Sequence, residues 1–161
     1  MIRLVIALLI AGAVPTEWER YESESCGFAL DFPGTVEVRT EPISNGTMTT
    51  FSTLRGRDSF SIACAELPAA LANAPDREER LDIAARDAVQ GASVERVTAD
   101  GYSARRTRRV YDLGDAELVV QHLHLFTATH KLSLGLADFD ATDEEVERFF
   151  GSLDVLDGAS E

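Results

Sequence analysis

The sequence predicts an α+β fold in which helices cover an antiparallel sheet of about seven strands. Short segments in which apolar and polar residues alternate are separated by turn residues, as expected for strands. The Asn45-Gly46 pair is a typical hairpin turn, which places its two flanking strands antiparallel. Two further segments carry apolar residues at helical spacing. With 161 residues, 45% of them hydrophobic, the chain is long enough to build one packed core.

The strands are recognised by their alternation and by the turns between them. Pro33-Gly34 ends the first strand, Gly101 separates two later ones, and Gly114-Asp115 separates the next pair. Asn45-Gly46-Thr47 also fits a glycosylation motif, but a hairpin turn is the preferred interpretation. The segments that share the strand pattern are residues 28–32, 35–43, 46–55, 59–65, 93–100, 102–112, 117–126 and 129–138.

The two helices are expected where the hydrophobic period changes. Asp76 and Glu79 have the spacing of a capping box at the start of the first helix, which should end near Gly91. Thr142 and Glu145 have the same spacing at the start of the second. The apolar positions at helical spacing are Leu81, Ala84, Ala85 and Ala88 in the first helix and Val146, Phe149, Phe150 and Leu153 in the second.

The N-terminal segment predicts export. Arg3 gives a positively charged start, residues 4–10 are apolar, and Ala11-Gly12-Ala13 matches the small-x-small pattern of a cleavage site. We therefore expect residues 1–13 to be a signal peptide. The apolar stretch is too short for a stable transmembrane helix, so the alternatives are an uncleaved interfacial anchor and a buried N-terminal strand.

The rest of the chain is expected to form a single domain at residues 14–156, followed by a flexible tail at residues 157–161. Lys131 is the only lysine among 15 basic residues, and alanine is abundant, a composition typical of a GC-rich bacterial genome. Together with the predicted signal peptide, this composition places the protein in the bacterial periplasm or outside the cell.

The charge of the chain argues against some classes of partner, and no sequence motif indicates a catalytic site. The 28 acidic and 15 basic residues give a formal net charge of −13, which repels nucleic acid and anionic lipid surfaces. The sequence has no GxSxG, Walker, GxGxxG or HExxH motif. We therefore expect neither an enzyme nor a cofactor.

The two cysteines, Cys26 and Cys64, are the candidate disulfide. An oxidising compartment favours the bond, and strand alternation puts Cys26 in phase with Phe28 and Cys64 in phase with Ile62, so both thiols should face apolar surroundings. The alternative is two separately buried thiols that behave as small hydrophobic residues.

His122 and His124 are the candidate metal ligands, because alternate residues of a strand point to one face. Pairing Leu125 with His130 across a loop at Thr127-Ala128 would put His130 on the opposite face. A three-residue loop would instead set His124 opposite His130. The alternative to a metal site is that the two histidines fill positions on a sheet face.

Four arginines occur in five residues, Arg105-Arg106-Thr107-Arg108-Arg109. Strand alternation sends Arg105 and Arg109 to one face, and these two are the candidate anion-binding residues. The alternative is that the arginines protect an edge strand or pair with the many carboxylates.

The order of several short motifs resembles the bacterial exported PsbP-like proteins, over residues 18–154. The segments that carry the resemblance are Trp18-Glu19-Arg20-Tyr21, Gly27-Phe28-Ala29-Leu30-Asp31-Phe32-Pro33-Gly34, Gly101-Tyr102-Ser103-Ala104-Arg105, the hairpin at residues 123–136 and Phe149-Phe150-Gly151-Ser152-Leu153. The resemblance implies an α/β/α sandwich around an antiparallel sheet. It also implies a binding or assembly role, and no shared set of catalytic residues.

We therefore expect an exported accessory protein that binds or helps to assemble another protein of the cell envelope. The alternative is a periplasmic protein that binds a small ligand, or a metal at His122 and His124.

Overall fold

The structure is a computed structural model that describes residues 17–156, and their fold is α+β, as predicted. The predicted signal peptide at residues 1–13 and the predicted tail at residues 157–161 lie outside the described residues. The elements in chain order are β1 (Glu19–Ser23), β2 (Phe28–Phe32), β3 (Glu37–Ile43), β4 (Gly46–Arg55), β5 (Asp58–Glu66), α1 (Ala69–Ala72), α2 (Arg77–Ala88), β6 (Ser93–Ala99), β7 (Tyr102–Asp112), β8 (Glu117–Phe126), β9 (His130–Asp138), α3 (Asp143–Gly151) and β10 (Asp154–Val155).

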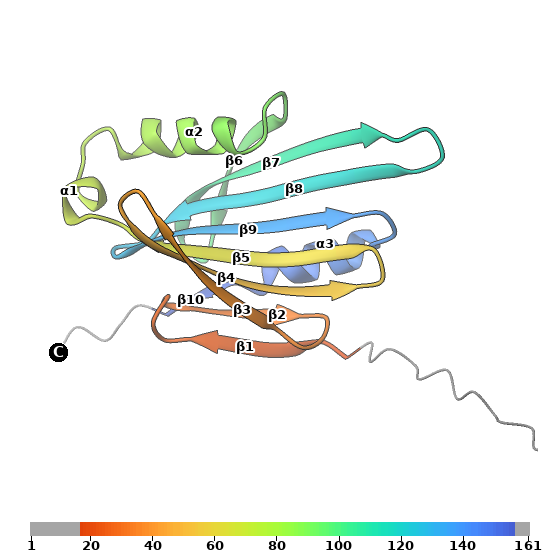
Figure 1. The fold of residues 1–161 in the computed structure, drawn as a ribbon. Coiled ribbons are helices and arrows are strands. Elements are labelled where there is room, and N and C mark those ends of the chain that lie inside the picture. Colours follow the sequence, from red (N-terminus) through yellow and green to blue (C-terminus); the bar gives the residue numbers. More distant parts are fainter. Residues whose placement is uncertain (1–16, 157–161) are drawn as a thin grey trace, which may run out of the picture.

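The strands of residues 17–156 form two antiparallel sheets (Figure 1). The main sheet has seven strands in the order β3-β4-β5-β9-β8-β7-β6, and the small sheet has three in the order β1-β2-β10. β5 pairs with β9 in the middle of the main sheet, where Ile62 faces Leu134. This pairing joins the strands that precede α2 to those that follow it.

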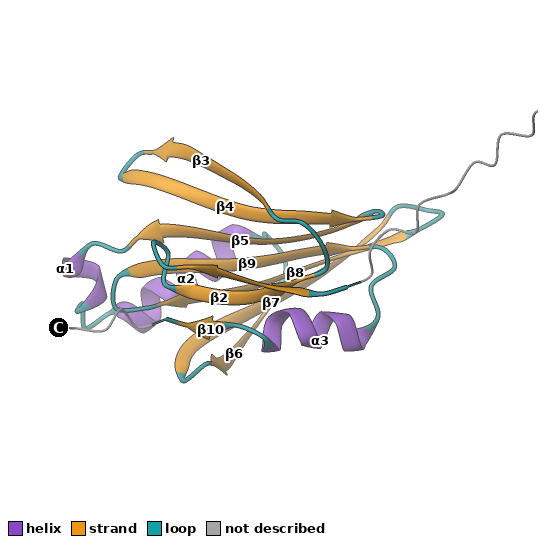
Figure 2. Cartoon of the chain, turned by 90° about the horizontal axis from the view of Figure 1, so that it is seen from below, coloured by secondary structure: helices purple, strands orange, loops and turns teal. Residues whose placement is uncertain are grey.

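One face of the main sheet is closed by a large hydrophobic core. Phe60 of β5 and Leu134 of β9 are fully buried there, together with Phe32 of the small sheet and Phe149 of α3. The rings of Phe60 and Phe149 meet edge to face with their centroids 5.3 Å apart. The small sheet and α3 therefore cover the same face of the main sheet, as Figure 2 shows from below.

The opposite face of the main sheet carries α2. α2 contacts β6, β7 and β8 and buries Leu81 and Ala85 against them. The strands on this face present mainly small and polar side chains, among them Ser61, Ala63 and Ser133. None of the helices within residues 17–156 is both long enough and apolar enough to cross a membrane.

One of the two predicted capping boxes is present. The side chain of Thr142 accepts from the Glu145 backbone N–H, and the Glu145 carboxylate accepts from the Thr142 N–H at 2.9 Å. The box predicted at Asp76 and Glu79 is wrong: the Asp76 carboxylate makes no capping bond and pairs with Arg80 at 2.9 Å. The backbone of Asp76 (φ −93°, ψ 17°) lacks the extended conformation in which an N-cap side chain reaches the helix start.

The β8–β9 hairpin has a different register from the predicted one. Leu125 faces Leu132, not His130, so the predicted pairing was wrong by two residues. The observed register places the leucines of the two strands opposite one another within the core. His130 still lies on the face opposite His122 and His124, because a shift by two residues preserves strand alternation.

Candidate binding site between helix α2 and the sheet

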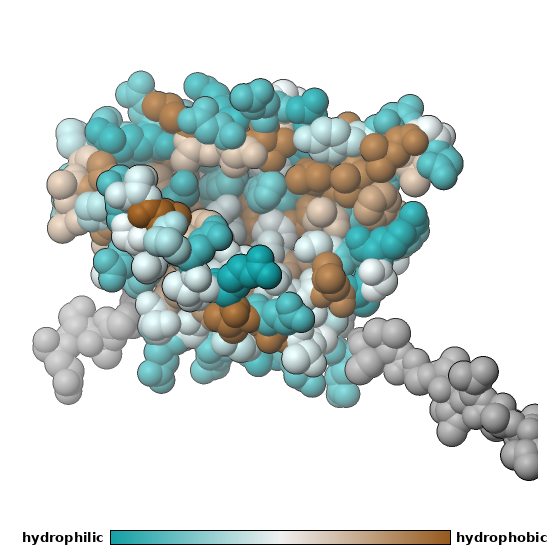
Figure 3. Space-filling view, viewed as in Figure 1, coloured by the Kyte–Doolittle hydropathy of each residue, from teal (hydrophilic) through white to brown (hydrophobic). Residues whose placement is uncertain are grey.

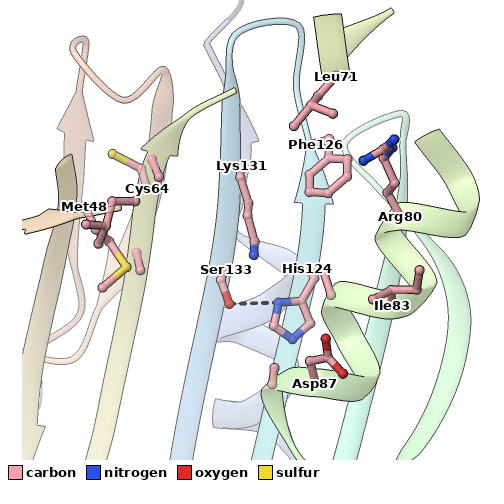
Figure 4. Close-up of a pocket in the computed structure, with 15 residues that line it drawn as sticks. Met48, Cys64, Leu71, Arg80, Ile83, Asp87, His124, Phe126, Lys131 and Ser133 are labelled. Atoms are coloured by element: carbon pink, nitrogen blue, oxygen red, sulfur yellow. Dashed lines mark hydrogen bonds between the residues drawn. The ribbon is translucent and has the colours of Figure 1, made fainter. Parts of the chain in front are cut away.

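A pocket of about 710 Å³ lies between α2 and the main sheet (Figure 4). Its floor is formed by β5, β9 and β8, with Ala63 and Ala65 on β5. Ile83 on α2 forms one wall, and Met48 on β4 with Ile43 on β3 forms the other. Figure 3 shows the hollow between the side chains of α2 and those of the β3–β4 hairpin.

The pocket exists because α2 covers only part of this face. α2 lies over β6, β7 and β8, whereas β4, β5 and β9 carry small side chains that fill little space above the sheet. The tip of the β3–β4 hairpin reaches toward the same side and encloses the gap. A larger residue at Ala63 or Ala65 would fill the floor.

His124 is the most buried polar side chain of the pocket, with 2% of its surface exposed. Its Nδ1 lies 2.9 Å from the Ser133 hydroxyl oxygen, and its Nε2 has no hydrogen-bond partner among the described residues. Burial, together with the charges of His122 and Lys131 acting in the same direction, lowers the pKa of His124 to about 4. The imidazole is therefore neutral at neutral pH.

We expect the His124 ring to titrate at about pH 4, measured by NMR of its ring signals. The unfolded chain binds this proton near pH 6.5, so the free energy of unfolding should fall as the pH drops from about 6.5 to about 4. A His124→Asn variant should show a shallower fall over this window. A ring that is already protonated at pH 6 would contradict the burial that the structure gives it.

The second candidate metal ligand, His122, stacks beside His124. The ring centroids are 5.5 Å apart, and the ring planes differ by 24°. Gly135 makes room for His122, because a Cβ at that position would lie 3.1 Å from the His122 Cδ2. His130 lies at the start of β9, where its Nδ1 is 2.9 Å from the Thr129 hydroxyl. Within residues 17–156, no group of three or more histidine, cysteine or acidic side chains is arranged to hold a metal.

Lys131 is the pocket residue with an uncompensated positive charge. Its side chain points along the floor toward Ser133 and His124 (Figure 4). It forms no ion pair with any described residue, whereas Arg80 on α2 is paired with Asp76 outside the pocket. Sequence reasoning did not select Lys131 as a site residue, although it is the chain's only lysine.

The two candidate anion-binding arginines are not brought to one site. Arg105 is fully buried and donates to Asp82 and, at 2.8 Å, to Glu78, both on α2. The hydrogen bonds from Arg105 hold the pKa of each carboxyl group below its usual value. Arg109 lies over the Tyr111 ring with its guanidinium carbon 4.6 Å from the ring centroid, and it donates to the Gln90 carbonyl.

Arg105 therefore anchors α2 to β7, in agreement with the alternative that these arginines pair with carboxylates. The sequence does contain a signal for this contact, because Glu78 and Asp82 are four residues apart and share one helix face. An external anion at Arg105 would have to displace both carboxylates.

Cys26 and Cys64 are joined in a disulfide, with their Cα atoms 6.0 Å apart. Both residues belong to the hydrophobic core, as predicted, although Cys26 lies in the turn before β2 and only Cys64 lies in a strand. The bond ties the turn before β2 in the small sheet to β5 in the main sheet.

Comparison with known proteins shows the fold but no family. The sequence matches no protein family model and no curated protein. The solution structure of cyanobacterial PsbP (CyanoP) from Synechocystis sp. PCC 6803 matches with a TM-score of 0.52 and 16% identity, over 89% of this chain and 95% of that one. A crystal structure from Bacteroides thetaiotaomicron VPI-5482 matches with a TM-score of 0.55 and 12% identity. That match covers 88% of this chain, which spans about half (49%) of the Bacteroides chain.

Proposed function

We propose that this protein, which has a PsbP-like fold, is an exported accessory protein that binds or helps to assemble another protein of the bacterial cell envelope. The observation that supports this function is the uneven cover of the main sheet. The small sheet and α3 close one face, whereas α2 leaves much of the other face uncovered. We call this uncovered part, on β4, β5, β9 and the start of β8, the open face.

The open face has the character of a protein interface. Leu118 and Val120 on β8 are half-buried, and Leu54 at the end of β4 is 75% exposed. Figure 3 shows apolar side chains gathered over the β7–β8 end of the sheet. Small neighbours such as Ser61 and Ala137 let a partner approach the sheet closely. An antiparallel sheet that faces only water usually carries polar side chains, so this apolar area favours a protein partner.

The disulfide supports the exported location, because such bonds persist in oxidising compartments. The predicted signal peptide at residues 1–13 supports it independently. A high negative charge also keeps the protein off anionic surfaces, which suits a role in protein binding.

The chemistry of the pocket supports a binding role over catalysis. Ser133 and His124 form a serine–histidine contact, the arrangement from which a nucleophile and base are built. However, His124 Nε2 lacks an orienting carboxylate among the described residues, and a pKa of about 4 makes this imidazole a weak base at neutral pH.

The test is site-specific photo-crosslinking in intact cells, followed by purification of the tagged protein and mass spectrometry. A crosslinker at Val120, on the open face, should capture one envelope protein reproducibly. The matched control is a crosslinker at Val110, which is 40% exposed on the opposite face of the neighbouring strand β7. A Leu54→Arg substitution, on the open face and outside the pocket, should abolish the Val120 product. Equal capture from Val120 and Val110, or no capture from either, would refute the proposal.

A further inference from the structure

We infer that the pocket between α2 and the sheet binds a small amphiphilic monocarboxylate, with its carboxylate at Lys131 and its apolar body between α2 and the β3–β4 hairpin. This inference goes beyond the proposed function and does not depend on it. The occupant is a free small molecule that has one negative charge and an apolar part.

The walls of the pocket favour a ligand with an apolar body. Ile83 on α2 and Ile43 on β3 are 47% and 39% exposed, although both line the same pocket. Met48 adds a flexible apolar side chain beside Ile43, and flexible methionines adapt to ligands of different shape. The volume of about 710 Å³ lies in the usual range for small-molecule sites.

Lys131 favours a ligand with a negatively charged head group. Lys131 is half-buried beside a neutral histidine, and its ammonium group has no ion-pair partner among the described residues. Partial burial of an unpaired charge costs free energy, which a carboxylate recovers through a charge-assisted hydrogen bond. The Ser133 hydroxyl lies on the same floor, where it offers the head group a second polar contact.

The other charged residues of the pocket limit the ligand to one negative charge. Arg80 is already paired with Asp76, so among the described residues that line this pocket Lys131 supplies the single cation without an ion-pair partner. Asp87 on α2 is exposed and lies on the other side of His124 from Lys131 in Figure 4. Its carboxylate repels a second negative charge and directs the head group to the Lys131 end.

His124 provides a second observation that points to a ligand. It is 98% buried, given its 2% exposure, and it lines the pocket with an Nε2 that has no partner among the described residues. Buried polar atoms are normally hydrogen-bonded, so the unpartnered nitrogen of a histidine that lines the pocket indicates an occupant with a polar group, which the carboxylate supplies.

The test is isothermal titration of the purified full-length protein, with its disulfide intact, against dodecanoate below its micelle concentration. We expect saturable binding of one dodecanoate per chain and no binding of dodecyltrimethylammonium, which has the same tail and the opposite charge. Lys131→Met, which keeps an apolar stem, should weaken dodecanoate binding about tenfold, whereas Lys131→Arg should retain it.

The matched control is Arg57→Met, which removes an exposed cation in the β4–β5 turn, paired with Asp140 and outside the pocket. This variant should bind dodecanoate like the unaltered protein. Ala84→Phe, which fills the pocket from α2, should weaken dodecanoate and dodecanol alike. Thermal unfolding of each variant confirms that it is folded.

Absence of saturable dodecanoate binding would overturn the inference, as would equal binding by Lys131→Met and the unaltered protein. If dodecanoate binding fails in this way but Val120 still crosslinks to an envelope protein, the proposed function stands and the ligand inference fails. Saturable, Lys131-dependent binding with no crosslinked partner would show the reverse.

Discussion

Asp82→Ala is expected to lower the free energy of unfolding by about 3 kcal/mol, because it removes one of the two carboxylates that compensate the buried charge of Arg105. The Arg105 side chain is fully enclosed between β7 and α2. Breaking a buried ion pair by removing one partner is costly, and here Arg105 would stay buried with Glu78 as its one remaining carboxylate partner among the described residues. Urea unfolding followed by circular dichroism measures the change.

The control is Glu78→Gln, which alters the other carboxylate that Arg105 contacts. The Glu78 side chain is 58% exposed, so water already screens its interaction with Arg105, whereas the Asp82 side chain is 15% exposed. We expect Glu78→Gln to cost about 1 kcal/mol or less. Similar small losses for both variants would show that Arg105 does not depend on Asp82.

The same ion pairs make stability depend on pH in the acid range. Hydrogen bonds from Arg105 lower the pKa of Asp82 from its usual value of 3.8, so the folded state holds this carboxylate ionised more strongly than the unfolded chain does. The contribution of the Asp82–Arg105 ion pair to the free energy of unfolding is therefore complete above pH 3.8. It is lost as the pH falls through the lower, folded-state pKa of Asp82. In a plot of the free energy of unfolding against pH, Asp82→Ala should flatten this acid part. His124→Asn should flatten the part between about pH 6.5 and about pH 4.

The strands of the main sheet could be predicted from sequence because their signals are local. β4, β7 and β8 begin and end at the predicted residues, since short turns bound them and most of these turns contain glycine. β1 was missed because Glu19–Ser23 is a charged segment whose side chains are mostly exposed. β10 was missed because its two residues, Asp154–Val155, are too few to show an alternating pattern of apolar and polar side chains.

The pocket could not be predicted, because it depends on residues far apart in the chain. Strand alternation correctly put His122 and His124 on one face. The space above that face arises because α2 stops short of β5 and β9, and this follows from tertiary packing. Likewise, Arg105 could be assigned to a face, but Glu78 and Asp82 reach it from a helix that precedes β6 in the chain.

The disulfide links the small sheet to the main sheet covalently, in addition to the backbone that connects them. Cys26 lies in the turn between β1 and β2, and Cys64 lies in β5, 38 residues later in the chain. The unfolded chain therefore loses the freedom of a loop of this length when the bond is present. The folded chain gains a fixed contact between the small sheet and the center of the main sheet.

Reduction of this bond is expected to lower the free energy of unfolding by about 4 kcal/mol, the value that chain entropy gives for a loop of 38 residues. Urea unfolding with and without a thiol reductant measures the loss, and a Cys26→Ser, Cys64→Ser double variant should reproduce it without any reductant. That double variant should also show no further response to reductant, since it has no other cysteine. Equal midpoints for the oxidised and reduced protein would mean that the hydrophobic core, which includes Phe32, Phe60 and Phe149, holds the two sheets together without the bond. A large loss would instead show that the domain is most stable where thiols are oxidised, which is the property that an exported protein requires.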